Sequence, residues 1–373
     1  MKNRNFLLIL LMSLGLFSCT ESIMQDINED KNHPADMASK FIITDVINNT
    51  SFSVIGSDFS FYASVYVEYN VGVHGQMYNA EIRIGEPTSA TTYNNSWNNV
   101  YSNLLNLKKV IEKCSPGGSE ESDTAVLGIA QVLSAYNLAT LTDLMGDVPW
   151  TEALQPGVIW TPVLDKQQSL YEVINKLITD GIANLEKTSS VPVIGTQDPI
   201  YKGVASNWVK FAYGLKARLA MRLSKVKPDY DAVIDAANKS FTAKGEEALF
   251  KCGTIKNPFS IFLTDRKAMG ASQSLHDKLV AKNDPRDGKF FKPYPGTSEL
   301  IFAPNGNPNQ VQGSYGVSAL STSTPTAPIY LMSYHELEFL KAEAYARKED
   351  LINAKIHLKN AVITAFTNVG IDA

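Results

Sequence analysis

The strongest constraint on the fold is a series of long segments in which apolar residues recur every three or four positions. The clearest of them spans 166–187, and Asp165 just before it is the expected N-cap. Another spans 206–225 and ends before Pro228, which cannot continue a helix. Each stripe is one buried face of an amphipathic helix, so the chain is predicted to be mainly α. The stripe of the first segment consists of Leu170, Val173, Ile174, Leu177, Ile178, Ile182 and Leu185.

The predicted helices come in pairs, and several pairs open alike. Trp97, Trp208 and Tyr334 each begin the aromatic-then-aliphatic spacing that is typical of a tetratricopeptide first helix. Because such a pair cannot bury its apolar face alone, neighbouring pairs must stack into a continuous core. We therefore predict degenerate tetratricopeptide-like helix pairs that form a curved scaffold. The other helices predicted by the same periodicity span 93–114, 123–145, 229–240, 333–347 and 351–366.

Four irregular stretches separate these helices and are longer than connectors need to be. They span 56–92, 149–162, 188–205 and 252–328, and they are rich in Gly, Asn, Pro, Ser and aromatic residues. We expect long irregular loops, with room for a few short strands. Long loops on a rigid helical scaffold are where ligand binding is expected.

The first residues carry a targeting signal. Lys2 and Arg4 precede an apolar stretch over 6–17, an arrangement typical of a secretory signal peptide and too short to span a bilayer. Cys19 follows a small residue where a bacterial lipoprotein signal is cut and the cysteine acylated. We predict a lipoprotein signal peptide at 1–18, lipid on Cys19 and a flexible polar tether over 19–35. The alternative is an ordinary signal peptide with a cysteine there by chance.

Charge and cysteine usage exclude several classes of protein. The formal net charge is −4, and no basic cluster points to nucleic acid. Cys114 and Cys252 would remain in the mature chain, with no histidine or cysteine at zinc-site spacing, so we interpret both as structural thiols and leave open whether they pair. No metal and no cofactor is predicted, and no segment after the leader is expected to reach the length of a transmembrane helix.

Four blocks of sequence resemble one family. The run Tyr-Asn-Leu-Ala-Thr-Leu-Thr-Asp-Leu-Met-Gly-Asp-Val-Pro-Trp at 136–150 is similar to the signature of SusD/RagB proteins, in which a helix ends in a Gly-Asp-Val-Pro-aromatic turn. The stretches 201–222 and 332–344 look like the family's next two blocks, and 27–32 resembles its tether, with Lys31 where proline is usual.

The resemblance implies a nutrient-binding lipoprotein that catalyses nothing. Such a protein is anchored by lipid in the outer membrane, facing the cell surface, and binds an oligosaccharide or a peptide. It passes this ligand to a SusC-like TonB-dependent transporter, on which it acts as a lid. The resemblance further implies a single SusD-like domain over 36–373. Because the chain stops at Ala373, we expect this domain to lack the family's usual C-terminal portion.

Two other functions compete with this interpretation. Asp143, Asp147 and Glu152 could supply the two carboxylates of a glycoside hydrolase. Helix capping and turn formation explain the same residues without chemistry, with Gly146 fitting a helix end that requires positive φ. The second alternative is a surface helical-repeat scaffold that binds another protein and no small nutrient.

Sugar binding requires flat aromatic faces together with amide or carboxylate groups for the hydroxyls. The stretch 66–83 offers both within a Gly-containing segment, and Trp160 lies in another loop. For any single aromatic residue, packing of the loop onto the helices is the competing interpretation. The predicted ligand-binding residues are Tyr66, Tyr69, His74, Gln76, Tyr78, Asn79 and Trp160.

Overall fold

The computed structural model describes residues 37–84 and 92–372, apart from the side chains of 321 and 322. The predicted signal peptide (1–18), the predicted lipidation site Cys19 and the predicted tether (19–35) therefore lie outside the described residues. The chain separates into two units, Met1–Ala38 and Ser39–Ala373, and the second is described below.

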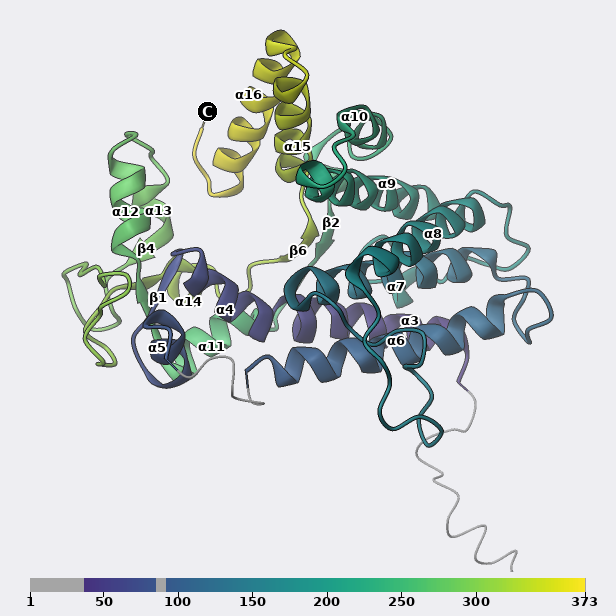
Figure 1. The fold of residues 1–373 in the computed structure, drawn as a ribbon. Coiled ribbons are helices and arrows are strands. Elements are labelled where there is room, and N and C mark those ends of the chain that lie inside the picture. Colours follow the sequence, from purple (N-terminus) through teal and green to yellow (C-terminus); the bar gives the residue numbers. More distant parts are fainter. Residues whose placement is uncertain (1–36, 85–91, 373) are drawn as a thin grey trace, which may run out of the picture. The chain divides into compact units, whose positions relative to one another are not determined.

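Seven helices of 9 to 22 residues form the part of the molecule that we call the helical frame (Figure 1). Consecutive helices of the frame pack on one another from the first to the fifth, and the last two form a hairpin. Every helix predicted from periodicity is present, so the mainly α class with paired helices is confirmed. The helices are α6 (Asn94–Cys114), α7 (Thr124–Met145), α8 (Gln167–Leu185), α9 (Ala205–Arg222, continued by the 3-10 turn Leu223–Lys225), α10 (Tyr230–Asn238), α15 (Tyr334–Arg347) and α16 (Leu351–Asn368).

Helix α7 is the central core helix of the frame and contacts both α6 and α8. By length and composition it could cross a membrane, which corrects the expectation that no segment after the leader reaches this length. Its most apolar window is, however, 83% buried inside the molecule, as in the core of a soluble fold. Gly128 permits close contact with α8, because a Cβ atom there would lie 2.7 Å from the carbonyl oxygen of Gly181.

The chain has a further helix before the frame, which the spacing of apolar residues did not predict. Helix α3 (Ser39–Asn49) runs into a π-helical turn, Thr50–Ile55. The buried side chains of Asn103 and Asn137 bind each other at 3.1 Å, and both donate to Thr50 Oγ1, at 3.1 and 3.0 Å. This polar cluster ties the turn to α6 and α7. The sequence held one signal for α3, the helical spacing of three apolar residues. These are Ile43, Val46 and Ile47, which are all fully buried.

Short elements fill two of the stretches expected to be irregular, and that expectation was wrong for both. Most of these elements are shorter than the nine residues of α10, the shortest helix that the periodicity predicted, and the two nine-residue helices among them have no clear apolar face. We call these elements and their connections the pocket region, residues 57–84 and 257–322. It contains α4 (Asp58–Tyr66), β1 (Asn70–Gly72), α5 (Gly75–Glu81), α11 (Pro258–Arg266), β3 (Met269–Ala271), α12 (Gln273–Val280), α13 (Asp287–Phe290), β4 (Phe291–Lys292), β5 (Val317–Ser318) and α14 (Ala319–Thr322).

The expected short strands form three antiparallel pairs within the described residues. Strand β1 pairs with β3, placing Asn70 opposite Ala271, and β4 pairs with β5. Strand β2 (Ala248–Phe250) pairs with β6 (Ile329–Met332), next to the start of α15. The first pair joins parts of the pocket region that lie far apart in the sequence.

Both cysteines of the second unit are buried and unpaired. Burial raises the pKa of the Cys114 thiol to about 11, and it also raises the pKa of Cys252. A thiol with a raised pKa is a poor nucleophile at neutral pH. Both cysteines are therefore free and buried, which supports their interpretation as structural thiols.

Candidate functional site

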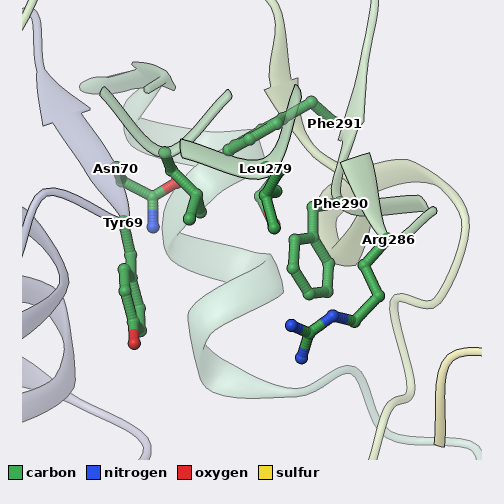
Figure 2. Close-up of a pocket in the computed structure, with 8 residues that line it drawn as sticks. Tyr69, Asn70, Leu279, Arg286, Phe290 and Phe291 are labelled. Atoms are coloured by element: carbon green, nitrogen blue, oxygen red, sulfur yellow. The ribbon is translucent and has the colours of Figure 1, made fainter. Parts of the chain in front are cut away.

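A cavity of about 340 Å³ lies in the pocket region, between β1 on one side and α12 and α13 on the other. Its volume is within the range of about 300–1,000 Å³ that is usual for small-molecule sites. Figure 2 places Tyr69 at one side of the opening and Phe290 with Arg286 at the other. The lining residues are Tyr69, Asn70, Leu275, Leu279, Arg286, Phe290, Phe291 and Ser318.

The wall that carries Tyr69 is fixed by hydrogen bonds to the start of α12. Ser272 caps this helix by accepting from the Leu275 N–H at 3.1 Å, and its hydroxyl donates to the Glu68 carbonyl at 2.7 Å. The Glu68 carboxylate accepts from Ser274 Oγ and, at 3.0 Å, from Lys278 Nζ. These hydrogen bonds hold the pKa of Glu68 below its usual range. The backbone next to Tyr69 is therefore anchored.

The opposite wall carries a guanidinium group that is only partly engaged. Arg286 donates to Asp284 through Nη2 at 2.6 Å and through Nε at 3.0 Å. This contact raises the pKa of Arg286 and lowers that of Asp284. Nη1 of Arg286 donates to no atom within 37–84 or 92–372, so the group keeps donors for a ligand. The guanidinium also lies 5.0 Å from the ring of Phe366 in α16, which connects this wall to the frame.

Helices α12 and α13 are held together behind this wall. His276 Nδ1 lies 2.8 Å from the Asp287 carboxylate, and the histidine ring stacks on Phe302 with the ring centroids 3.9 Å apart. The ring of Phe302 in turn meets Phe291 edge to face. The aromatic side of the cavity is therefore packed rather than loose.

Asn70 provides a buried amide group in this cavity. It is 7% exposed, and its side-chain oxygen has no hydrogen-bond partner among the described residues. A buried polar atom without a partner costs about 1–3 kcal/mol, which a bound polar group can recover. Together with the aromatic faces of Tyr69 and Phe290, this amide and Arg286 can bind a ligand that has both an apolar face and hydroxyl groups.

The predicted ligand-binding residues are spread over several environments. Tyr69 lines the cavity, and Tyr66 borders a second cavity of about 340 Å³ beside Glu68, Glu81 and Arg83. Four predicted residues belong to α5 or directly precede it, so they form a helix rather than a loop: His74, Gln76 and Asn79 are exposed, and Tyr78 is half-buried. Trp160 lies in a separate segment and is 83% exposed.

Seven of the eight lining residues were absent from the sequence prediction, and three of them, Asn70, Arg286 and Phe290, carry the polar and aromatic groups described above. The pairing of β1 with β3 and the packing of α12 and α13 bring them together. Short-range patterns in the sequence carry no signal for such long-range contacts. The only local hint was the Asp-Pro-Arg-Asp run at 284–287 in a stretch expected to be a loop.

The Gly-Asp-Val-Pro turn at 146–149 holds the end of α7 next to the start of α8. Gly146 ends α7 with φ of +77°, as predicted. Asp147 accepts from the Gln167 N–H at 2.9 Å and from Lys166 Nζ, so it caps α8 from across the turn. Asp165 was expected to cap α8 itself, and this was wrong: its carboxylate accepts from the N–H groups of Trp150 and Thr151, at 2.7 and 3.0 Å.

The other two carboxylates near this turn also have partners in the fold. Asp143 pairs with Arg222 and accepts from the Tyr171 hydroxyl, while Glu152 accepts from the Val163 N–H at 3.0 Å. Together with Asp147, these residues hold α8, α9 and the connecting segment in place. Helix capping, ion pairing and turn formation therefore account for all three.

The fold and the cavity define a helical-repeat protein that carries a ligand-sized pocket on a region of short elements. The sequence model of a SusD-like family, described as "Starch-binding associating with outer membrane", matches residues 31–368. The chain belongs to this family.

Solved structures agree with this assignment. A SusD/RagB family protein from Bacteroides thetaiotaomicron is 42% identical, with a TM-score of 0.82 over 89% of this chain and 72% of that one. A chitin-binding protein is 25% identical, with a TM-score of 0.67 over 83% of this chain and 70% of its own. A chitin-binding SusD homolog from Flavobacterium johnsoniae, 19% identical, shares the fold with a TM-score of 0.74 over 90% of this chain and 72% of its own. A comparison with curated proteins gave no match.

Proposed function

We propose that this protein binds an oligosaccharide nutrient at the cavity between Tyr69 and Arg286. The observation that carries the proposal is the buried amide oxygen of Asn70, which has no partner among the described residues and lines the cavity beside Tyr69, across from Phe290. A sugar ring can place its apolar face on an aromatic side chain while its hydroxyls bind the amide and the guanidinium. The exposed ring of Tyr69, 59% accessible, is the first surface that such a ligand would meet.

The comparisons favour a glycan over a peptide. The family is described as starch-binding, and two of the similar solved proteins are chitin-binding. Starch and chitin differ in linkage and in substituents, so these names support the class of ligand and do not identify the sugar. A peptide remains the alternative ligand.

We further propose that the protein works at the cell surface of the outer membrane, anchored by lipid on Cys19. There it would act as the lid of a SusC-like TonB-dependent transporter and release the ligand into it. The family's description as outer-membrane-associated supports this placement. A tether keeps the binding site at high effective concentration beside the pore, so modest affinity is sufficient.

We propose that the protein binds its ligand without catalysis and that the carboxylates near the turn have a structural role. Asp143, Asp147 and Glu152 hold helix ends and loop backbone, which supports a structural role for each of them. Release of products from a glycan, lost in Asp147→Ala, would favour the hydrolase instead. The protein-binding scaffold gains if neither oligosaccharides nor peptides bind while a protein other than a transporter does.

Isothermal titration against a panel of oligosaccharides and peptides tests the pocket. We expect Tyr69→Ala and Arg286→Ala each to weaken oligosaccharide binding at least tenfold, which corresponds to about 1.4 kcal/mol. Tyr78→Ala, which removes an aromatic residue outside the cavity, should leave affinity unchanged. If Tyr78→Ala abolishes binding and Tyr69→Ala does not, the ligand binds on α5 and the pocket assignment is wrong. Mass spectrometry of Cys19 in the native host tests the anchor separately.

A further inference from the structure

Two adjoining cavities lie on the helical frame, away from the residues that line the pocket between Tyr69 and Arg286. We propose that it is an additional oligosaccharide-binding site, formed by one face of α6 and the segment 149–164. We call it the α6 groove. The inference goes beyond the proposed function, because it assigns a separate site to the part of the molecule that otherwise serves as scaffold.

The groove has room for more than one sugar ring. Its main cavity measures about 530 Å³. An adjoining cavity of about 370 Å³ shares the wall formed by Ala153, Leu154 and Gln155. Two cavities on a common wall suit an extended chain better than a single ring. The main cavity is lined by Trp97, Asn98, Tyr101, Ser102, Leu105, Pro149, Ala153, Leu154, Gln155, Pro156, Ile159 and Pro162.

The segment opposite α6 is fixed to the frame by hydrogen bonds. The Tyr101 hydroxyl donates to the Pro149 carbonyl at 2.8 Å, and Lys108 Nζ donates to the Leu154 carbonyl at 3.2 Å. At the far end of the segment, Glu152 accepts from the Val163 N–H. A groove with fixed walls loses little conformational entropy when a ligand binds.

The chemistry of the lining fits a neutral carbohydrate. The rings of Trp97 and Tyr101 lie 5.1 Å apart along α6 and form an aromatic strip. Beside them, the side chains of Asn98, Ser102 and Gln155 make no hydrogen bond to any residue in the described ranges, so they remain available to hydroxyl groups. No charged side chain lines the main cavity, and the adjoining cavity has one residue of each sign, Lys108 and Glu112. The groove therefore has no excess of positive charge for an acidic or phosphorylated ligand.

A peptide fits this lining less well. Extended peptides commonly bind by adding a strand to an open sheet edge, and the groove is bordered by a helix and an irregular segment instead. An uncharged polyhydroxylated chain needs only flat aromatic surface and scattered amide or hydroxyl groups. The lining supplies both.

Trp160 is adjacent in the sequence to residues that line the groove. It is 83% exposed and lies in the sequence between Ile159 and Pro162, which both line the main cavity. A fully solvated indole on an anchored segment offers a stacking surface for a further sugar ring. The prediction of Trp160 as a ligand-binding residue thus belongs to this site rather than to the first pocket.

The test uses the full chain and isolates the groove by removing the first pocket with Tyr69→Ala. The probes are neutral hexasaccharides, namely maltohexaose, cellohexaose, chitohexaose, mannohexaose and xylohexaose. Saturation-transfer NMR and isothermal titration report binding. Adding Asn98→Ala, Ser102→Ala and Gln155→Ala to Tyr69→Ala should weaken the residual binding at least tenfold. Adding instead Asn307→Ala, Ser323→Ala and Gln168→Ala, which remove exposed residues of the same types outside the groove, should leave it unchanged.

Each outcome separates the two sites. If wild type binds a hexasaccharide and Tyr69→Ala abolishes all binding, the groove proposal is overturned and the first pocket stands. If Tyr69→Ala keeps the full affinity and stoichiometry of the wild type while the groove substitutions lose binding, the first pocket is wrong and the groove stands. Absence of binding to all five probes by the wild type overturns both. Displacement of a bound hexasaccharide by a neutral polyproline peptide overturns the assignment to carbohydrate. Unfolding curves of all variants confirm that the fold is intact.

Discussion

The helical frame and the pocket region are stabilised in different ways. In the frame, one continuous cluster of buried apolar residues runs through α3, the helices from α6 to α10, α15 and the β2–β6 pair. The pocket region instead contains two small clusters, one around Phe61, Tyr62 and Met77 and one around Val71 and Tyr315. We infer that the frame provides most of the stability of the fold and that the pocket region recognises the ligand.

Side-chain hydrogen bonds add to the stability of the pocket region, whose apolar cores are small. The buried carboxylate of Glu81 accepts from the N–H groups of Gly72 and Gly306, joining β1 to a distant loop. The side-chain oxygen of Asn305 accepts from the Ser274 N–H at 2.9 Å and lies 3.1 Å from the Ser272 hydroxyl oxygen. Regions held mainly by such bonds open locally at lower free energy than a large apolar core does.

The largest effect is expected from the core of the frame. Trp208 is fully buried, and its Nε1 donates to the buried Asp198 at 2.7 Å. Trp208→Ala should lower the free energy of unfolding by about 3–5 kcal/mol because it creates a cavity. Urea denaturation measures this. Trp160→Ala, at an 83% exposed site, is the matched control and should change stability by less than about 0.5 kcal/mol. Equal losses in the two variants would contradict the single-core description.

An intermediate effect is expected where α7 meets α8. Gly128→Ala places a methyl group within 2.7 Å of the Gly181 carbonyl oxygen and should destabilise the protein by about 1–3 kcal/mol through overpacking. Thermal unfolding provides the measurement. Gly245→Ala is the control, since a Cβ atom there meets nothing within 4 Å. A neutral Gly128→Ala would mean that the two helices do not pack this closely.

A local effect is expected in the pocket region. Glu81→Ala removes the acceptor for two backbone N–H groups, of which that of Gly72 is buried, and should lower global stability by about 1–2 kcal/mol, within the cost of a buried donor left without a partner. Hydrogen exchange should accelerate at Gly72 and Gly306 and remain slow in α7. Glu81→Gln, which keeps one acceptor oxygen, should lie between wild type and alanine. Uniform acceleration over the whole chain would contradict the division between the regions.

The smallest effect concerns acid pH at the α7–α8 turn. Burial alone would raise the pKa of Asp165, but hydrogen bonds from Thr151 and Trp150 outweigh it and hold this pKa below the ordinary value of 3.8. The carboxylate therefore stabilises the fold fully above pH 3.8, and this contribution disappears as the pH falls through the lowered pKa. Wild type should exceed Asp165→Asn by less than about 1 kcal/mol at neutral pH, as is usual for exposed charged contacts. The two proteins should converge in acid, and a difference that grows on acidification would contradict this assignment.

Sequence periodicity predicted the frame well because each long helix repeats its apolar stripe over several turns. It failed for α3, whose stripe is short, and for the pocket region, where strands of two or three residues gain their stability from partners far along the chain. Tyr69 was predicted from local aromatic content, whereas Asn70 and Arg286 meet only through tertiary packing. The sequence also could not show that Asp147, rather than Asp165, caps α8, because both residues lie at plausible capping positions.

The proposed sugar site is the cavity between Tyr69 and Arg286. A crystal structure of the protein soaked with the tightest-binding oligosaccharide of the panel shows whether a sugar binds there. We expect a sugar ring against Tyr69, with hydroxyl groups within hydrogen-bonding distance of the Asn70 amide and of Arg286 Nη1. An ordered oligosaccharide bound elsewhere, with no sugar between Tyr69 and Arg286, would contradict it.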